Sequence, residues 1–102
     1  MFTAQSPADL MPLEEISTIS GLDFMRGILE GRLPGPPIAA LLGYHLQDVS
    51  EGRAVFRGRP EFQVTNPMGT VHGGWYGTLL DSAMACAVMT AVPKGSVYTT
   101  LE

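Results

Sequence analysis

Residues 66–81 read NPMGTVHGGWYGTLLD, a sequence in which a turn leads directly into an apolar helix. Asn-Pro and Gly, within 66–69, are strong breakers of regular structure. Mostly apolar side chains then continue to residue 92, and Pro-Lys-Gly at 93–95 ends the pattern. The spacing predicts a helix over 73–92 that begins at two glycines and buries most of its surface.

The glycine pair at the start of this helix has two interpretations. The first backbone amides of a helix have no partner within it, and the positive end of the helix dipole lies there. Because Gly73 and Gly74 carry no side chain, an anionic or carbonyl oxygen could approach these amides closely. Alternatively, the glycines only permit a sharp turn from strand to helix. The spacing alone leaves both interpretations open.

Asp81 lies within the same helix, among neighbours that are nearly all apolar. A carboxylate buried there must find partners or take up a proton, which suits a general base. Alternatively, Asp81 lies on a solvated stripe with Thr78 and Ser82. Asp81 and Ser82 follow Thr78 by three and four residues, and residues at these spacings are neighbours on a helix. The sequence does not decide between these two environments.

The distance between the two features limits what one chain can do. Gly73 and Asp81 are eight residues apart, which is about 12 Å along a helix. A general base acts within about 3 Å of its proton, so the two groups cannot easily meet at one reacting carbon. Two antiparallel copies of the helix around a two-fold axis would bring Gly73 of one subunit near Asp81 of the other. The economical arrangement is therefore a homodimer with two shared sites.

The rest of the chain predicts short elements. A Ser-Pro-Ala-Asp sequence and three- or four-residue apolar steps indicate helices, and alternating polar and apolar residues indicate a hairpin. The expected elements are a short helix at 6–9, a helix over 22–33, a short turn or helix over 38–42 closed by Gly43, strands over 44–49 and 53–59, and the opening of a further strand over 97–102. Residues 1–43 thus form a helical lead-in to a domain over 44–102.

The arginines of the hairpin allow two interpretations. Arg53, Arg57 and Arg59 lie on the polar side of an alternating pattern that Val55 interrupts. They could hold a phosphate, whereas solvated arginines on a strand are the commoner case. No other residue in the pattern decides between these.

Composition and charge exclude several classes of protein. With 102 residues and 45% hydrophobic residues, the chain suits one globular domain. Six Lys and Arg against ten Asp and Glu give a net charge of −4, which argues against a nucleic-acid partner. The apolar stretch 75–92 contains Asp81, whose charge disfavours a membrane span. Since no signal peptide is evident and a single cysteine cannot form an internal disulfide, we expect a cytoplasmic protein with no membrane partner.

The remaining chemistry-bearing residues give weak signals. His72 could hydrogen-bond a substrate carbonyl or exchange a proton, although a lone histidine before a turn is more often structural. His72, Asp81 and Cys86 do not have the spacing of metal ligands, so no metal is expected. Cys86, in an apolar helix, suits an inert core position. Ser82 lacks the context of a nucleophile elbow, which disfavours a serine hydrolase.

The motif N-x-x-G-x-x-H-G-G at 66–74, followed by Thr-Leu-Leu-Asp at 78–81, resembles the hot-dog-fold acyl-CoA thioesterases of the PaaI-like group, which belong to the 4HBT superfamily. The strong match covers residues 66–102. The resemblance implies an α+β fold in which an antiparallel sheet wraps around a long central helix. It also implies hydrolysis of an acyl-CoA thioester to a free acid and coenzyme A. The family's chains continue for two or three more strands, so we expect 44–102 to be a partial hot-dog domain, truncated at its C-terminus.

The resemblance also implies roles for individual residues. The Gly73 amide polarises the thioester carbonyl, and Asp81 from the opposing subunit acts as nucleophile or as base for water. Asn66 and His72 help to position these groups. Thr100 fits the family's T-x-E pattern on the strand after the helix, with Thr99 as its competitor. No cofactor is expected apart from coenzyme A as part of the substrate.

The resemblance leaves partners and rival functions to be weighed. The expected partners are an acyl-CoA substrate and copies of the same chain, as a homodimer or a dimer of dimers. Four apolar or aromatic side chains of the helix could line an acyl pocket: Trp75, Tyr76, Met84 and Met89. The alternatives are a non-catalytic acyl-CoA-binding module and an inactive fragment of a longer enzyme. A further rival is a hydratase or dehydratase acting on enoyl thioesters, which would use a catalytic histidine in a different loop.

Overall fold

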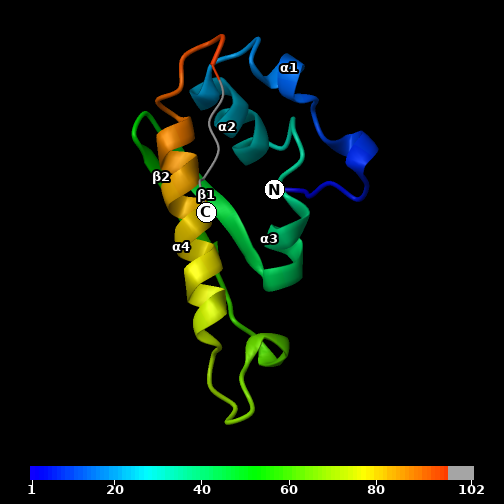
Figure 1. The fold of residues 1–102 in the computed structure, drawn as a ribbon, viewed down its shortest axis with the longest axis vertical. Helices are drawn as coiled ribbons and strands as arrows, with labels where there is room; N and C mark the ends of the chain where they lie inside the picture. Colours follow the sequence, from blue (N-terminus) through cyan, green and yellow to red (C-terminus); the bar gives the residue numbers. More distant parts are fainter. Residues whose placement is uncertain (97–102) are drawn as a thin grey trace.

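A computed structural model describes residues 1–96 of the chain as a mixed α+β structure of 46 × 27 × 26 Å (Figure 1). Its sheet has two antiparallel strands, and one long helix runs beside it along the long axis (Figure 1). In chain order the elements are η1 (Pro7–Asp9), α1 (Leu13–Ile16), α2 (Gly21–Leu29), α3 (Pro37–Leu42), β1 (Tyr44–Ser50), β2 (Arg53–Gly58), η2 (Phe62–Val64) and α4 (Gly73–Met89). The α+β class expected from the sequence is confirmed at this level.

The hairpin of β1 and β2 forms where the alternating pattern predicted it. Its turn contains Gly52 with φ of 76°, a left-handed conformation that glycine adopts without strain. The register shifts between Leu46 and Asp48, which leaves one extra residue in β1 as a bulge. The bulge allows the apolar set of β1 to stay on one side, with Leu46 and Val49 both buried. One side of the hairpin therefore faces the helices and the other faces solvent.

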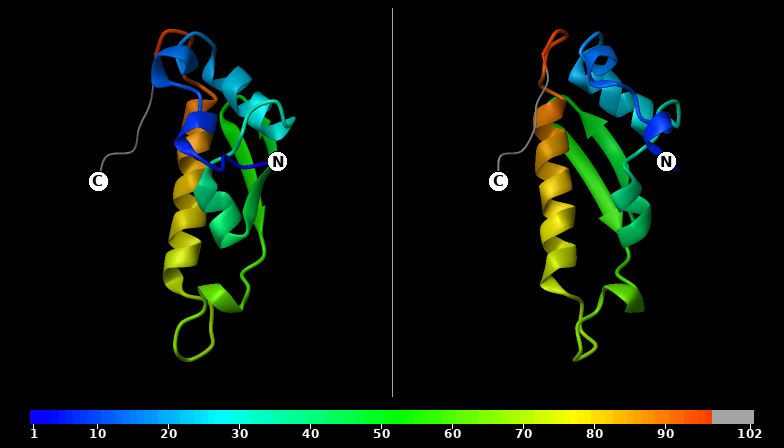
Figure 2. Two further views of the ribbon diagram at one scale, coloured as in Figure 1. Left: turned by 90° about the vertical axis from the view of Figure 1, so that its right-hand side faces the viewer. Right: turned by 45° about the vertical axis from the view of Figure 1, so that its right-hand side comes forward.

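The core lies between the hairpin, α2 and α4. Buried Met25 and Ile28 of α2 pack with Leu46 and Val49 of β1. Half-buried side chains of β2 and α4 close this cluster, among them Phe56, Cys86 and Met89. Ser20 is the N-cap of α2, and its hydroxyl accepts a hydrogen bond from the Asp23 amide at 3.1 Å. α2 and α4 thus pack against the same side of the hairpin (Figure 2).

α2 ends at Leu29 and not at Leu33, as the apolar spacing had suggested. The chain reverses at Gly31, which has φ of 79°, and the amides of Arg32 and Leu33 both bond to the Gly27 carbonyl. Leu33 then folds back, so that a Cβ on Gly27 would lie 2.6 Å from its Cδ1. The spacing of Leu33 therefore reflects packing against α2 after a turn rather than a further helical turn.

The long helix α4 begins at Gly73 as expected but ends at Met89, three residues before the predicted end. The Thr90 hydroxyl donates to the Ala87 carbonyl at 2.6 Å and accepts from the Gly52 amide at 2.7 Å. The Val92 carbonyl is bound by the Gly21 amide at 2.9 Å, which ties the segment after α4 to the start of α2. These bonds turn the chain before Pro93.

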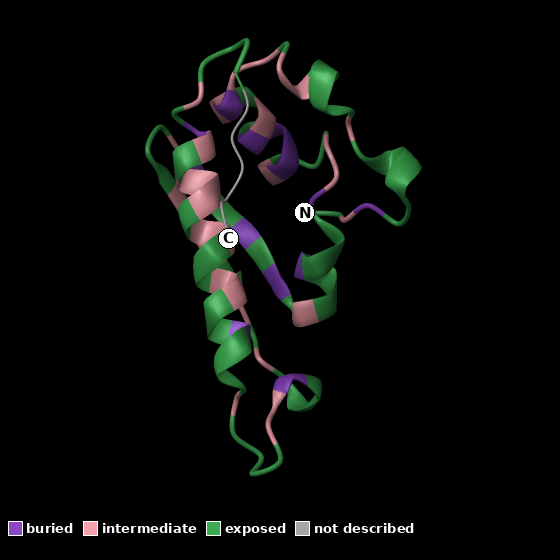
Figure 3. Cartoon of the chain, viewed as in Figure 1, coloured by how far each residue is buried: buried purple, intermediate pink, exposed green. Residues whose placement is uncertain are grey.

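The prediction that α4 buries most of its surface is wrong for the described residues. Within α4 only Trp75 is buried, and Figure 3 shows exposed positions along the whole helix. One side packs on the hairpin and α2, whereas the opposite side carries large apolar residues in solvent. The sequence pattern reports the apolar character of the helix, but it does not tell what covers each side.

Three further expectations concern the N-terminal helix, the last strand and the domain boundary. The short helix at the N-terminus is the 3₁₀ helix η1, whereas α1 was not predicted. The strand expected over 97–102 lies outside the described residues. The boundary between a lead-in over 1–43 and a domain over 44–102 stays a prediction.

Within residues 1–96, no helix combines the length and apolarity that crossing a bilayer requires.

Candidate functional site

The loop before α4 is held by short-range bonds that fix where the helix begins. The amide of Asn66 binds the Thr70 carbonyl, and that of Gly69, with φ of 80°, binds the Asn66 carbonyl, both at 2.9 Å. The His72 amide donates to the Val64 carbonyl at 2.9 Å, next to an antiparallel bridge between Thr65 and Val71. The expected turn is therefore present, and it delivers His72 to the start of α4.

His72 caps α4. Its Nδ1 accepts a hydrogen bond from the Gly74 amide at 2.8 Å, which requires a ring without a proton on Nδ1. Its carbonyl accepts from the Trp75 amide at 3.0 Å. The residue thus satisfies two of the free amides at the helix start, so the structural interpretation of His72 is supported. No group among residues 1–96 bonds to its other ring nitrogen, Nε2.

The Gly73 amide is the first of α4 and has no acceptor within the helix. Within residues 1–96 no loop or side-chain acceptor bonds to it either. Gly73 is exposed, and a Cβ built on it would meet nothing within 4 Å. An N–H donor at the positive end of a seventeen-residue helix therefore faces open space, where an oxygen carrying negative charge would be stabilised.

Asn66 has a structural role in its own turn. Its Nδ2 donates to the Thr70 hydroxyl at 2.8 Å. Its Oδ1 accepts from the amides of Met68 at 2.9 Å and Thr70 at 3.3 Å. Both ends of the side chain therefore hold the loop, and the expected role of Asn66 in positioning a reacting group stays a prediction.

Asp81 is exposed, so the argument that it is a buried carboxylate is wrong for the described residues. The alternative of a common solvated stripe is also incomplete. Ser82 is half-buried and shares a hydrogen bond of 2.9 Å with the Tyr44 hydroxyl, and the Thr78 hydroxyl donates to the Gly74 carbonyl at 2.8 Å. Asp81 belongs to the exposed side of α4, which also carries Gly73, about 80° around the helix and about 12 Å away. One chain does not bring the two together.

Cys86 is a partly buried thiol on the packed side of α4. Burial, and to a smaller extent the nearby Asp81 carboxylate, raises the pKa of the Cys86 thiol to about 11. A thiol with a raised pKa is a poor nucleophile at neutral pH. The core role expected for Cys86 is thus supported.

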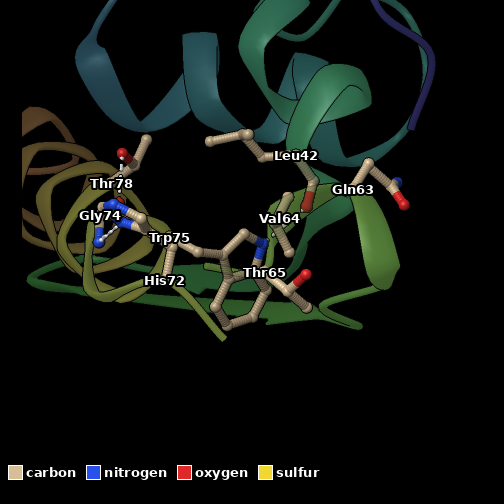
Figure 4. Close-up of a pocket in the computed structure, with 8 residues that line it drawn as sticks. All are labelled: Leu42, Gln63, Val64, Thr65, His72, Gly74, Trp75 and Thr78. Atoms are coloured by element: carbon tan, nitrogen blue, oxygen red, sulfur yellow. Dashed lines mark hydrogen bonds between the residues drawn. The ribbon is translucent and has the colours of Figure 1, made fainter. Parts of the chain in front are cut away.

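A hollow of about 380 Å³ opens beside the start of α4. Its lining comes from the end of α3, the loop before α4 and the first turns of α4 (Figure 4): Leu42, Gln63, Val64, Thr65, His72, Gly74, Trp75 and Thr78. Trp75 and Leu42 form adjacent parts of its wall, because the indole Nε1 donates to the Leu42 carbonyl at 2.7 Å. The hollow therefore combines an aromatic and aliphatic wall with a few polar groups near the helix start.

Four of the lining residues carry no signal in the sequence that marks them as part of a site: Leu42, Gln63, Val64 and Thr65. Leu42 lies in another element, 33 residues before Trp75, and the hydrogen bond that joins them leaves no trace in local spacing. Of the side chains expected to line an acyl pocket, Trp75 lines this hollow, whereas Tyr76 and Met84 are exposed on the other side of α4.

Two expected groups cannot be placed in this site. Thr100 and its competitor Thr99 lie outside the described residues. Among residues 1–96, no group of three His, Cys, Asp or Glu side chains is close enough to hold a metal ion. The described site therefore consists of the Gly73 amide, the His72 cap, the hollow and, on the same exposed side of α4, Asp81.

The family model of a domain of unknown function (DUF4442) matches residues 35–100. This match spans well over half of the chain, and the chain belongs to this thioesterase-like family. It covers the hairpin, the loop before α4 and α4 itself, the elements that build the site. No curated protein and no solved structure matches the chain.

Proposed function

We propose that this protein is an acyl-CoA thioesterase with a hot-dog fold, which hydrolyses a thioester to a free carboxylic acid and coenzyme A. The observation that carries the proposal is the Gly73 amide at the start of α4, which has no acceptor among residues 1–96 and lies on the exposed side of the helix that also presents Asp81. The thioesterase-like family supports the same class of reaction.

The reaction needs a donor for the thioester oxygen. When a nucleophile attacks the thioester carbonyl, negative charge develops on its oxygen, and a preorganised N–H donor stabilises that charge. The Gly73 amide is suited to this role because it lies at the positive end of the helix dipole and no side chain covers it. The hollow beside His72 and Trp75 would receive the group attached to this carbonyl.

In the proposed mechanism, Asp81 attacks the carbonyl carbon or removes a proton from the attacking water. If Asp81 acts as the base, the attacking water forms a tetrahedral intermediate, the carbon–sulfur bond breaks to give the free acid, and the coenzyme A thiolate takes up the proton that Asp81 removed. If Asp81 attacks directly, breaking the carbon–sulfur bond leaves an acyl-aspartyl anhydride, which a water molecule then hydrolyses to the free acid and the regenerated carboxylate, while the thiolate takes a proton from solvent. Because Gly73 and Asp81 are about 12 Å apart along α4, the acid must come from a second copy of the chain. Each site would therefore combine Gly73 of one protomer with Asp81 of the partner subunit.

The exposed side of α4 supports this arrangement. Four apolar side chains spaced four residues apart form a stripe: Tyr76, Leu80, Met84 and Val88, with exposed fractions of 51, 59, 63 and 45%. Residues at this spacing share one side of a helix, and such a contiguous apolar surface is typical of a protein interface. An antiparallel α4 of a partner subunit would cover the stripe and complete two identical sites.

The test is the release of free thiol from a panel of acyl-CoA substrates. We expect the wild-type chain to hydrolyse at least one of them and Asp81→Asn to reduce its kcat at least about 100-fold, since a positioned acid or base contributes about that much. Glu51→Gln is the matched control, because it removes the same charge in an exposed hairpin turn and should keep the wild-type rate. An unchanged rate in Asp81→Asn would contradict the proposal.

A mixing experiment tests whether the site is shared. Gly73→Pro removes the amide hydrogen, and proline is well tolerated at the first position of a helix. Each variant alone should keep about 1% of the wild-type kcat or less. A mixed dimer of Asp81→Asn and Gly73→Pro, in contrast, contains one site with both wild-type groups. Recovery of part of the activity on mixing supports the shared site, and no recovery despite exchange of subunits contradicts it. Binding of acyl-CoA with no thiol release by the wild type would indicate a non-catalytic binding module.

A further inference from the structure

A second hollow, of about 420 Å³, lies at the end of the hairpin near α3. It is lined by Gly43, His45, Arg57, Gly58, Arg59 and Pro60. Tyr44 points toward α4, where its hydroxyl meets Ser82, and side chains alternate along a strand. His45 and its cross-strand partner Arg57 are both exposed on the opposite, outer side of the hairpin. This hollow is therefore separate from the one at the start of α4.

The basic groups of this hollow lack counter-charges. Arg32 and Arg53 each pair with a carboxylate, Glu30 and Asp48, with N–O distances of 2.7 Å. Within residues 1–96, no carboxylate pairs with Arg57 or Arg59. The lining contains no acidic residue, and Glu61, the next acid along the chain, does not line it. In a protein of net charge −4, two arginines and a histidine thus share one recess without an acid.

We propose that this hollow binds a phosphate or diphosphate group of a small-molecule ligand. A guanidinium presents several N–H donors in a planar fork that matches phosphate oxygens, and such charge-assisted hydrogen bonds are among the stronger ones. Arg57 and Arg59 supply two forks, and His45, directly opposite Arg57 across the strands, supplies a further donor. An anion there removes the repulsion between the two guanidinium charges.

The position of the hollow suggests two sources for the group. Leu42 lines the hollow at the start of α4, and the next residue, Gly43, lines this one. One extended ligand, such as coenzyme A with its phosphates, could therefore reach both, or a free phosphate compound could occupy the basic hollow alone. The proposal concerns the phosphate group itself and stands without the thioesterase activity, because it can be measured with ligands that contain no thioester.

The test is calorimetric titration of the full chain with pyrophosphate and, separately, with coenzyme A. We expect saturable binding of pyrophosphate that weakens as sodium chloride is added, because exposed charges are screened by salt. Arg57→Gln and Arg59→Gln should each weaken it roughly tenfold, the usual order for losing a hydrogen bond to a charged group. Arg26→Gln is the matched control, since it removes the same charge from the exposed surface of α2 and should leave binding unchanged.

The two titrations show whether the phosphate group belongs to coenzyme A or to a free phosphate compound, and which results overturn the proposal. Coenzyme A binding much more tightly than pyrophosphate, with both weakened by the double variant Arg57→Gln/Arg59→Gln, assigns the hollow to the extended ligand. Equal affinities assign it to a free phosphate compound. Absence of saturable pyrophosphate binding, or binding that the double variant retains while its circular dichroism matches the wild type, overturns the proposal. None of these results depends on whether thiol is released from acyl-CoA.

Discussion

Trp75 joins the start of α4 to the end of α3, and its replacement by phenylalanine tests how the site is held. The indole is only 5% exposed, and its Nε1 donates to the Leu42 carbonyl at 2.7 Å. Its Cζ2 lies beside Gly58, where an added Cβ would be 2.9 Å away. Phenylalanine keeps an aromatic ring in the core but removes the donor and part of the buried volume.

The expected loss of stability is the sum of two effects. Removing the donor leaves the Leu42 carbonyl without its partner, which costs about 1–2 kcal/mol. The smaller ring leaves part of a buried space unfilled, which costs about 1 kcal/mol. The free energy of unfolding of Trp75→Phe should therefore fall by about 2–3 kcal/mol, a decrease in Tm of about 10–20 °C for a domain of this size.

The assay is urea unfolding followed by far-UV circular dichroism, since Trp75 is the single tryptophan and its fluorescence is lost in the variant. Tyr76→Phe is the matched control, because Tyr76 is its neighbour in α4 but is 51% exposed. The control should change the free energy of unfolding by less than about 0.5 kcal/mol. If Trp75→Phe is as stable as the control, the hydrogen bond to Leu42 does not anchor α4 and the account of this contact is wrong.

Two further predictions concern packing and pH. Gly58→Ala should lower the free energy of unfolding by about 1–3 kcal/mol, because its Cβ would lie 2.7 Å from the Tyr44 Cβ. The control Gly77→Ala should not be destabilising, since a Cβ there meets nothing within 4 Å. Equal urea midpoints for the two variants would refute this. The pKa of Cys86 is raised from an ordinary 9.0 to about 11, so the thiol ionises at lower pH in the unfolded chain than in the folded one. The contribution of Cys86 to the free energy of unfolding is therefore complete below pH 9.0 and is lost as the pH rises toward 11. Stability measured across this range should therefore decline less steeply in Cys86→Ala than in the wild type, and identical slopes would exclude the thiol as a cause.

The sequence predicted those elements whose signals are local. Glycine at 43 ended α3, the alternating residues formed the hairpin, and the glycine pair marked the start of α4 to the residue. These features depend on backbone conformation and side-chain period, which nearest neighbours determine. The end of α2 was missed because Leu33 keeps a helical spacing while packing back onto Gly27 through a turn.

The environment of the candidate site depended on contacts that no local pattern contains. The apolar pattern of α4 indicated burial, but the exposed stripe, from Tyr76 to Val88, has no cover among residues 1–96. For the same reason, the sequence left open whether Asp81 is buried or solvated, and the structure places it on the exposed side of the helix. The capping role of His72 was within reach of the sequence, because its position directly before two glycines is that of an N-cap. The hydrogen bond from Trp75 to Leu42 could not be predicted from the sequence, because the two residues lie 33 positions apart.

The central claim is that the Gly73 amide stabilises the oxygen of a thioester during hydrolysis. The direct test measures thiol release from acyl-CoA by Gly73→Pro, which lacks the amide hydrogen, beside Gly73→Ala, which keeps it. Both variants suit the first position of α4, where His72 already has an extended ψ of 136° and an added Cβ meets nothing within 4 Å. We predict that kcat falls about 100- to 1,000-fold in Gly73→Pro, as for the loss of an oxyanion donor, and far less in Gly73→Ala. Equal rates in Gly73→Pro and the wild type would contradict the account.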